Sequence, residues 1–173
     1  FLRPYLAEAV ASVCGDDVEL CAVCVAKGME FLNAPYETIQ KVTEELVRSD
    51  GERYCFSKSQ EEVDTLLWEA QLKYVFPLVE NYRRYFVKKY YDFIKAALPI
   101  NNGYGDQVMV PEEAELGNLM YLVERGGIPV SAEESMELKR YRKARNELAH
   151  MNLLSNEELC VILKAGKHKT ASD

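Results

Sequence analysis

The chain has 173 residues, of which 48% are hydrophobic and 28% are charged, with a formal net charge of −7. This composition is typical of a globular protein with one core or two small ones. The negative balance argues against broad, nonspecific binding to nucleic acid but leaves a small local site open. No apolar run reaches the length of a membrane helix and no signal peptide is visible, so we expect no membrane contact. The five cysteines are an odd number, which is typical of reduced thiols in a cytoplasmic protein.

The N-terminal third is predicted to be helical. Pro4 suits the first turn of a helix to Cys14, a second helix reads VELCAVCVAKGMEFL, and a third spans 36–48 before a strand-like piece at 54–56. These elements fit a small winged-helix-like module and a helical lead-in equally well, so residues 1–58 are expected to be one or the other. The third helix mixes cations with carboxylates, which argues against contact with DNA phosphates.

Residues 59–166 are predicted to form a second helical domain, followed by a flexible tail at 167–173. Serine and glutamate recur at the spacing of a capping box before three of its helices. The pairs are Ser59 with Glu62, Ser131 with Glu134, and Ser155 with Glu158. These pairs predict three helix starts.

The segments between these starts contain helix breakers. Pro77 is expected to kink or split a long helix over 60–97, and a surface loop is expected over 99–110. Pro111 then opens a helix that Gly126 and Gly127 end, and the last helix is expected to stop near Ala165.

Known phosphate-binding and metal-binding patterns are absent from the sequence. It lacks both GxxxxGK[ST] and GxGxxG, and we expect no cofactor. Cys21 and Cys24 form a CxxC pattern without a second one. A zinc site from these two with Cys14 and Cys55 has atypical spacing, so buried structural thiols and no metal are expected.

The segment YRKARNELAH contains a cation in an unusual place. Leu138, Tyr141, Arg145 and Leu148 follow an alternation of three and four residues, which predicts that Arg145 lies on the buried stripe of a helix. A buried guanidinium is costly unless it is paired, with Glu115 as the candidate partner, or used to hold a phosphate. His150 lies about 140° further round a regular helix.

The hexapeptide RNELAH at 145–150 resembles the R-N-x-x-x-H form of the Rx4-6H motif of the HEPN superfamily (higher-eukaryote and prokaryote nucleotide-binding domains). The upstream segments ELGNLMYL and Tyr82–Tyr91 look like the helices that precede this motif in bacterial members. The resemblance covers roughly residues 60–165. It implies a mostly α protein whose C-terminal part is an up-and-down helical bundle.

Many members of that superfamily are metal-independent endoribonucleases of toxin or defence type, in which two protomers bring their motifs together. The resemblance implies a homodimer in which His150 acts as acid and base, Arg145 stabilises charge on the phosphorane, and Asn146 orients the phosphate or the histidine. Other members are non-catalytic dimerisation or interaction modules of larger proteins, which is the alternative here. Because residue 1 is Phe rather than Met, an upstream domain or regulatory partner also stays open.

The segment YRRYFVKKYY interleaves cations with aromatic residues. Such a pattern suits single-stranded RNA, which both stacks and carries negative charge. The predicted RNA-binding residues are Arg83, Arg84, Lys88 and Lys89, with Arg142 from the next basic helix. For the aromatic residues themselves, burial in the core of an amphipathic helix is the favoured interpretation.

Overall fold

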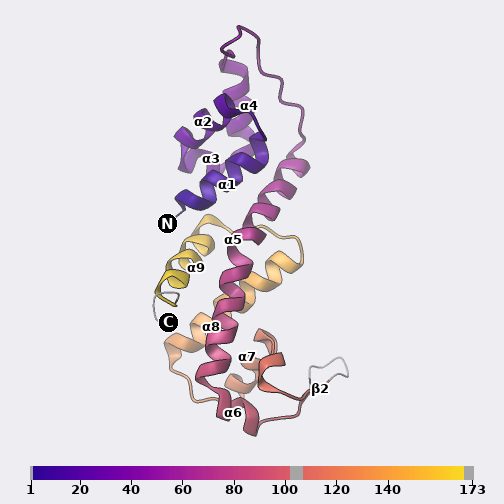
Figure 1. Cartoon of the computed structure of the whole chain (residues 1–173), viewed down its shortest axis with the longest axis vertical. Helices are drawn as coiled ribbons and strands as arrows, with labels where there is room; N and C mark the ends of the chain where they lie inside the picture. Colours follow the sequence, from indigo (N-terminus) through magenta and orange to yellow (C-terminus); the bar gives the residue numbers. More distant parts are fainter. Residues whose placement is uncertain (1, 102–106, 170–173) are drawn as a thin grey trace. The chain divides into compact units, whose positions relative to one another are not determined.

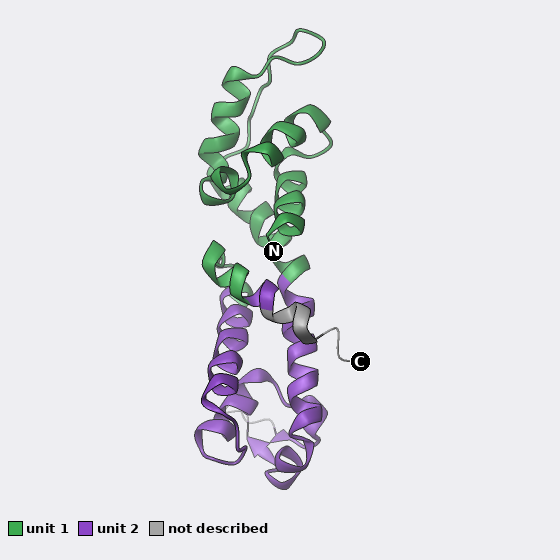
Figure 2. Ribbon diagram, turned by 90° about the vertical axis from the view of Figure 1, so that its left-hand side faces the viewer, with its two compact units in different colours: residues 1–74, 148–161 green, residues 75–147, 162–173 purple. Residues whose placement is uncertain are grey.

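The computed structural model describes residues 2–101 and 107–169, and it is mostly helical, as the sequence predicts. The chain divides into two compact units (Figure 2). Unit 1 comprises residues 1–74 and 148–161, and unit 2 comprises residues 75–147 and 162–173. The expected domain boundaries at 58/59 and 166/167 stay predictions.

Four short helices begin unit 1 (Figure 1). They are α1 (Arg3–Cys14), α2 (Val18–Lys27), α3 (Met29–Asn33) and α4 (Pro35–Glu45). The second predicted helix is therefore interrupted at Gly28, whose φ of 56° lies in the left-handed region that favours glycine. No strand forms at 54–56. A single antiparallel bridge joins Val47 to Arg53 just before that segment, so the prediction of a strand at 54–56 is wrong.

The long helix α5 (Gln60–Lys89) begins in unit 1, where it forms part of the core. The side chains of Phe31 and Ile39 are fully buried there, as is Val63 of α5.

Gln71 of α5 is a buried polar side chain whose amide donates and accepts hydrogen bonds. It donates to the Tyr5 hydroxyl at 3.2 Å and the Leu154 carbonyl at 3.1 Å, and it accepts from the Leu154 N–H at 2.8 Å. The segment before α9 is thereby tied to α5.

Helix α5 continues through Pro77, where the sequence predicts a kink or a split, and ends only at Lys89. A proline removes one helical hydrogen bond, but burial of the neighbouring Val75 and Val79 favours continuation. The interruption falls instead at Tyr90, which precedes α6 (Tyr91–Ala96).

The remaining elements belong mainly to unit 2. They are β1 (Ile100–Asn101), β2 (Gln107–Val108), the 3-10 turn η1 (Pro111–Glu113), α7 (Leu116–Glu124), α8 (Ala132–Ala149) and α9 (Asn156–Lys169), which begins in unit 1. The two strands pair antiparallel within the predicted loop, with Ile100 opposite Val108, while residues 102–106 of that loop lie outside the described residues. Pro111 opens a 3-10 turn rather than a helix, and α9 extends to Lys169, beyond Ala165.

The core of unit 2 is built on aromatic contacts between α5 and α8. The rings of Tyr82 and Tyr141 stack with centroids 4.0 Å apart and planes 9° apart. Phe86 and Tyr90 are also buried, which confirms the core interpretation for these two residues and Tyr82, whereas Tyr85 and Tyr91 are exposed and do not follow it. Phe93 is 47% exposed, since α6 starts a new helix with its own phase.

All three predicted capping boxes form. In each pair the glutamate side chain accepts from the serine N–H at 2.7–3.1 Å, and the serine hydroxyl accepts from the glutamate N–H at 3.2 Å. Local sequence therefore fixes the starts of α5, α8 and α9. Among the described helices, none is both long and apolar enough to cross a membrane.

Candidate functional site

Arg145 is exposed, so the prediction that it lies on a buried stripe is wrong. The buried positions of α8 are Leu138, Tyr141, Ala144 and Leu148. The stripe advances by three residues twice before it advances by four, and this places Ala144 rather than Arg145 on it. With 3.6 residues per turn, Arg145 lies about 100° away from Ala144, on the solvent side.

The alternative in which Arg145 pairs with Glu115 is not found within the described side chains. Glu115 is the N-cap of α7, and its side chain accepts a hydrogen bond from the backbone of Asn118. The Asn118 side chain in turn accepts from the Glu115 N–H at 2.9 Å. Within the described side chains, the Arg145 guanidinium has no hydrogen bond or ion pair, so all its donors are open to a ligand.

The other two motif residues are also accessible. Asn146 is half-buried in α8, and His150 is exposed directly after the helix ends at Ala149. The following residue, Met151, has a φ of 61°, which is uncommon for a side chain other than glycine or asparagine. Arg145 and Asn146 fall in unit 2 and His150 in unit 1.

Helix α8 carries a row of exposed cations in unit 2, which we call the α8 basic row: Lys139, Arg142 and Arg145. Residues three apart are neighbours along a helix surface, so their charges reinforce one another. None of the three has an ion pair within residues 2–101 and 107–164. The row includes the predicted RNA-binding Arg142. Lys139 was missed, although its spacing of three from Arg142 signals it.

Arg83, one of the predicted RNA-binding residues on α5, is a structural anchor. Its guanidinium donates to both carboxylate oxygens of Glu80, at 2.7 and 2.9 Å. It also donates to the carbonyls of Glu112 and Ala114, at 2.7 and 3.1 Å. The Arg83 hydrogen bonds lower the pKa of Glu80 to about 2. The guanidinium thus holds the chain before α7 against α5.

Lys89 is similarly engaged. Its ammonium group pairs with Glu134, which also caps α8 and accepts from the Tyr90 hydroxyl at 2.9 Å. The hydrogen bond from Lys89 lowers the pKa of Glu134 to about 2, and the same contact raises the pKa of Lys89. Glu134 therefore joins the cap of α8 to the end of α5.

Arg84 and Lys88 remain on the surface of α5. Arg84 donates only its Nε to Glu80, at 2.9 Å, and its side chain is 72% exposed. A hollow of about 350 Å³ borders both residues. Its lining comprises Arg83, Arg84, Val87, Lys88, Tyr91 and Glu112. Two of the four predicted cations on α5 are therefore accessible to an anion.

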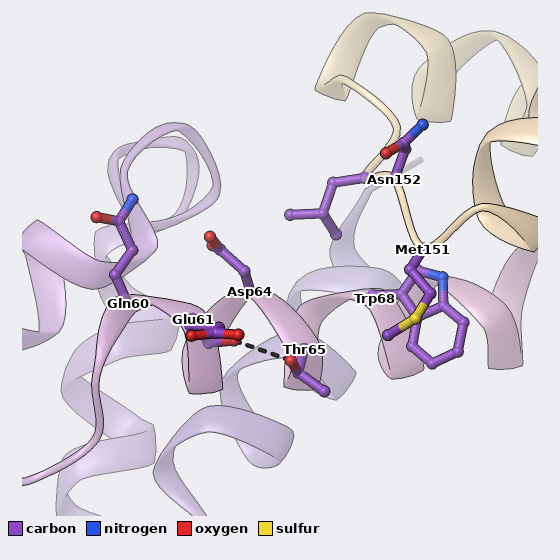
Figure 3. Close-up of a pocket in the computed structure, with 8 residues that line it drawn as sticks. Gln60, Glu61, Asp64, Thr65, Trp68, Met151 and Asn152 are labelled. Atoms are coloured by element: carbon purple, nitrogen blue, oxygen red, sulfur yellow. Dashed lines mark hydrogen bonds between the residues drawn. The ribbon is translucent and has the colours of Figure 1, made fainter.

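A larger groove lies in unit 1, between the first turns of α5 and the chain that follows His150 (Figure 3). Its volume is about 750 Å³. The lining side chains are Gln60, Glu61, Asp64, Thr65, Trp68, Met151, Asn152 and Leu153. Sequence analysis missed this groove because its two walls are about 85 residues apart in the chain.

The cysteines are all free thiols. Only Cys24 is buried; Cys14 and Cys21 are half-buried, and Cys55 is exposed, so the expectation of buried thiols holds for one of these four. The described residues contain no group of three or more histidine, cysteine or acidic side chains that could hold a metal ion.

Comparison of the chain with protein-family models, curated proteins and solved structures finds no match. A functional assignment therefore depends on the accessible side chains described above.

Proposed function

We propose that this protein is a metal-independent endoribonuclease of the HEPN kind, acting as a homodimer through Arg145, Asn146 and His150. The observation that carries the proposal is the free guanidinium of Arg145 within the α8 basic row. A structural arginine is normally paired with a carboxylate, as Arg83 is. An exposed row of cations that has no ion pair among the described side chains and leads into the RNxxxH sequence is suited to binding phosphate.

In the proposed reaction, the 2′-hydroxyl oxygen of one nucleotide attacks the adjacent phosphorus and the bond from phosphorus to the 5′-oxygen breaks. His150 accepts the proton of the 2′-hydroxyl. The departing 5′-oxygen takes a proton from an acid, for which the partner subunit's His150 is the candidate. Imidazole suits both roles because it titrates near neutral pH. The products are a 2′,3′-cyclic phosphate and a 5′-hydroxyl.

The charge that develops on the phosphorane oxygens needs donors that are already in position. Arg145 supplies a planar set of N–H donors that remains charged throughout the reaction. Asn146 supplies an amide that orients the phosphate or the imidazole. No metal ion is needed for either role, which gives the proposal a direct biochemical signature.

The α8 basic row provides local positive charge that RNA binding needs in a protein with a negative net charge. An overall charge of −7 repels RNA at long range, so binding needs a local cluster of cations. Lys139 and Arg142 supply it beside Arg145, and Arg84 and Lys88 offer further cations on α5. Each phosphate contact releases counterions, which makes RNA binding strongly dependent on salt.

The alternative function, a non-catalytic HEPN-like dimerisation or interaction module, has less support. An ion pair between Arg145 and Glu115, buried away from water, would favour that alternative. Glu115 instead caps α7, and Arg145 is exposed. The exposure of Arg145 therefore supports the catalytic proposal over the interaction module.

The test is cleavage of a mixed RNA pool in EDTA by the wild type, by His150→Ala and by His168→Ala. The two histidines are the only ones in the chain, which makes the second variant a matched control. We expect the wild type and His168→Ala to cleave and His150→Ala to lose at least about 100-fold in rate. Folding and dimerisation of each variant are checked by circular dichroism and sedimentation. Equal cleavage by all three proteins, or none by the dimeric wild type, contradicts the proposal.

A further inference from the structure

We propose that the groove of unit 1 binds a guanine base of RNA. The inference rests on the proposed ribonuclease function, because residues 151–153 of the groove directly follow His150 in the chain. A base held there belongs to a nucleotide at or beside the cleaved phosphate. The groove would therefore give the enzyme a preference for guanosine.

The groove has an apolar side that suits a planar ring. Trp68 is half-buried, and its indole Nε1 donates to the Leu148 carbonyl at 2.8 Å, which fixes the edge of the ring. Met151, 63% exposed, lies next to the indole in Figure 3. A fixed aromatic ring with a flexible thioether beside it offers a stacking surface for a base at little entropic cost.

The groove also has a polar side that selects among the bases. Asp64 extends from α5 on the side of the segment that carries Asn152 (Figure 3). Its carboxylate is exposed and has no hydrogen bond or ion pair within residues 2–101 and 107–164. An ionised carboxylate only accepts hydrogen bonds and has two oxygens side by side.

Guanine alone matches such an acceptor on its pairing edge. Its ring N1–H and its 2-amino group are adjacent donors, so both can bind one carboxylate. Adenine, cytosine and uracil each place an acceptor beside their donor on that edge, which would face a carboxylate oxygen unfavourably. A site whose acceptors need two donors discriminates strongly against a base that lacks one of them.

A basic peptide is the competing occupant, since the carboxylates of Glu61 and Asp64 beside an indole also suit a cation. Two observations favour the base. The groove volume of about 750 Å³ lies in the range of about 300–1,000 Å³ that is typical of small-molecule sites. The groove wall is also continuous in sequence with His150, the residue assigned to phosphate chemistry.

Trp68 gives a direct readout because it is the only tryptophan in the chain. The wild type is titrated with GMP, AMP, CMP and UMP while the tryptophan fluorescence is recorded. We expect quenching by GMP with an affinity at least about ten-fold higher than for the other nucleotides. Asp64→Asn, which keeps the shape but removes the charge and one acceptor, should lose most of this preference. Glu44→Gln, an exposed carboxylate on α4 outside the groove, should keep it.

Each outcome decides the inference. Equal quenching by all four nucleotides, no quenching by GMP, or a GMP response that Asp64→Asn leaves unchanged overturns it. Quenching by a peptide of alternating arginine and leucine without a response to GMP also overturns it and assigns the groove to a basic protein partner. GMP binding by a protein that cleaves no RNA keeps the inference and contradicts only the proposed function. RNA cleavage without a preference for guanosine keeps the proposed function and contradicts the guanine site.

Discussion

The basic residues of α5 and those of α8 look alike in the sequence but differ in the structure. On α5, Arg83 is held by Glu80 and by two backbone carbonyls, and Lys89 is held by Glu134. On α8, the cations of the basic row have no such contacts within the described side chains. Arg83 and Lys89 of α5 position neighbouring segments, whereas the three cations of the α8 basic row are available.

The difference follows from which carboxylates are within reach. Glu80 precedes Arg83 and Arg84 by three and four residues, the spacing at which helical side chains meet. Glu134 pairs with Lys89 because the first turn of α8, which contains Glu134, lies against the end of α5 in unit 2. Availability, rather than the mere presence of positive charge, therefore identifies the cations that can bind RNA.

Among the substitutions that test this comparison, Arg145→Ala is expected to have the largest effect, which is on RNA cleavage. Replacement by alanine should reduce RNA cleavage by about 10²–10³-fold, the usual loss when one donor to a developing oxyanion is removed. Because the side chain is exposed and has no partner among the described side chains, the free energy of unfolding should change by less than about 0.5 kcal/mol. Cleavage kinetics and urea unfolding of one preparation measure both. A large loss of stability with normal cleavage would reverse the roles assigned to the two helices.

Arg83→Ala should show the opposite pattern. The substitution leaves the carbonyls of Glu112 and Ala114 without this donor and leaves the Glu80 carboxylate with Arg84 alone, and we expect a loss of about 2–3 kcal/mol in the free energy of unfolding. Arg83→Lys should recover little of it, since an ammonium cannot reproduce the forked contacts. Chemical unfolding measures both variants. A change below about 0.5 kcal/mol for Arg83→Ala would remove the anchor role.

A smaller effect is expected at Arg142, measured as RNA affinity in a His150→Ala background that cannot cleave. Arg142→Ala should weaken binding and lower the slope of log affinity against log salt by about one, the value for one lost phosphate contact. Lys89→Ala is the matched control, because Lys89 is already paired with Glu134. Equal slopes for the two variants would show that the distinction between open and engaged cations is wrong.

The smallest effect is expected for Glu134→Gln, which keeps the capping box but removes the charge that pairs with Lys89. Both partners are partly exposed, so the loss at pH 7 should be about 0.5 kcal/mol. The pKa of Glu134 is lowered to about 2 in the folded state, so its contribution is present above the unfolded value near 4.5 and disappears as the pH falls to about 2. Unfolding at several pH values measures this. A difference between wild type and variant that persists at pH 2 would contradict the ion pair.

Local patterns in the sequence predicted the helices well because their causes are local. A serine and a glutamate three residues apart fix a helix start without help from the rest of the fold, and all three such starts form. Pro77 does not split α5, because packing on either side outweighs the loss of one helical hydrogen bond, and the sequence alone does not show that packing.

The candidate site could be predicted only in part. The positions of Arg145 and His150 near the end of α8 follow from spacing, but the side on which Arg145 lies depends on a shift of one residue in the buried stripe. The groove with Asp64, Trp68 and Met151 could not be predicted, because it requires the chain after α8 to return to the start of α5. Such a contact is set by tertiary packing and leaves no mark on local periodicity.

The most direct test of the central claim is the chemistry of the RNA ends produced in EDTA. We predict a 2′,3′-cyclic phosphate and a 5′-hydroxyl from the wild type, and neither from His150→Ala. A 3′-hydroxyl with a 5′-phosphate, or cleavage that EDTA abolishes, would contradict attack by the 2′-hydroxyl with His150 as the proton-transfer group.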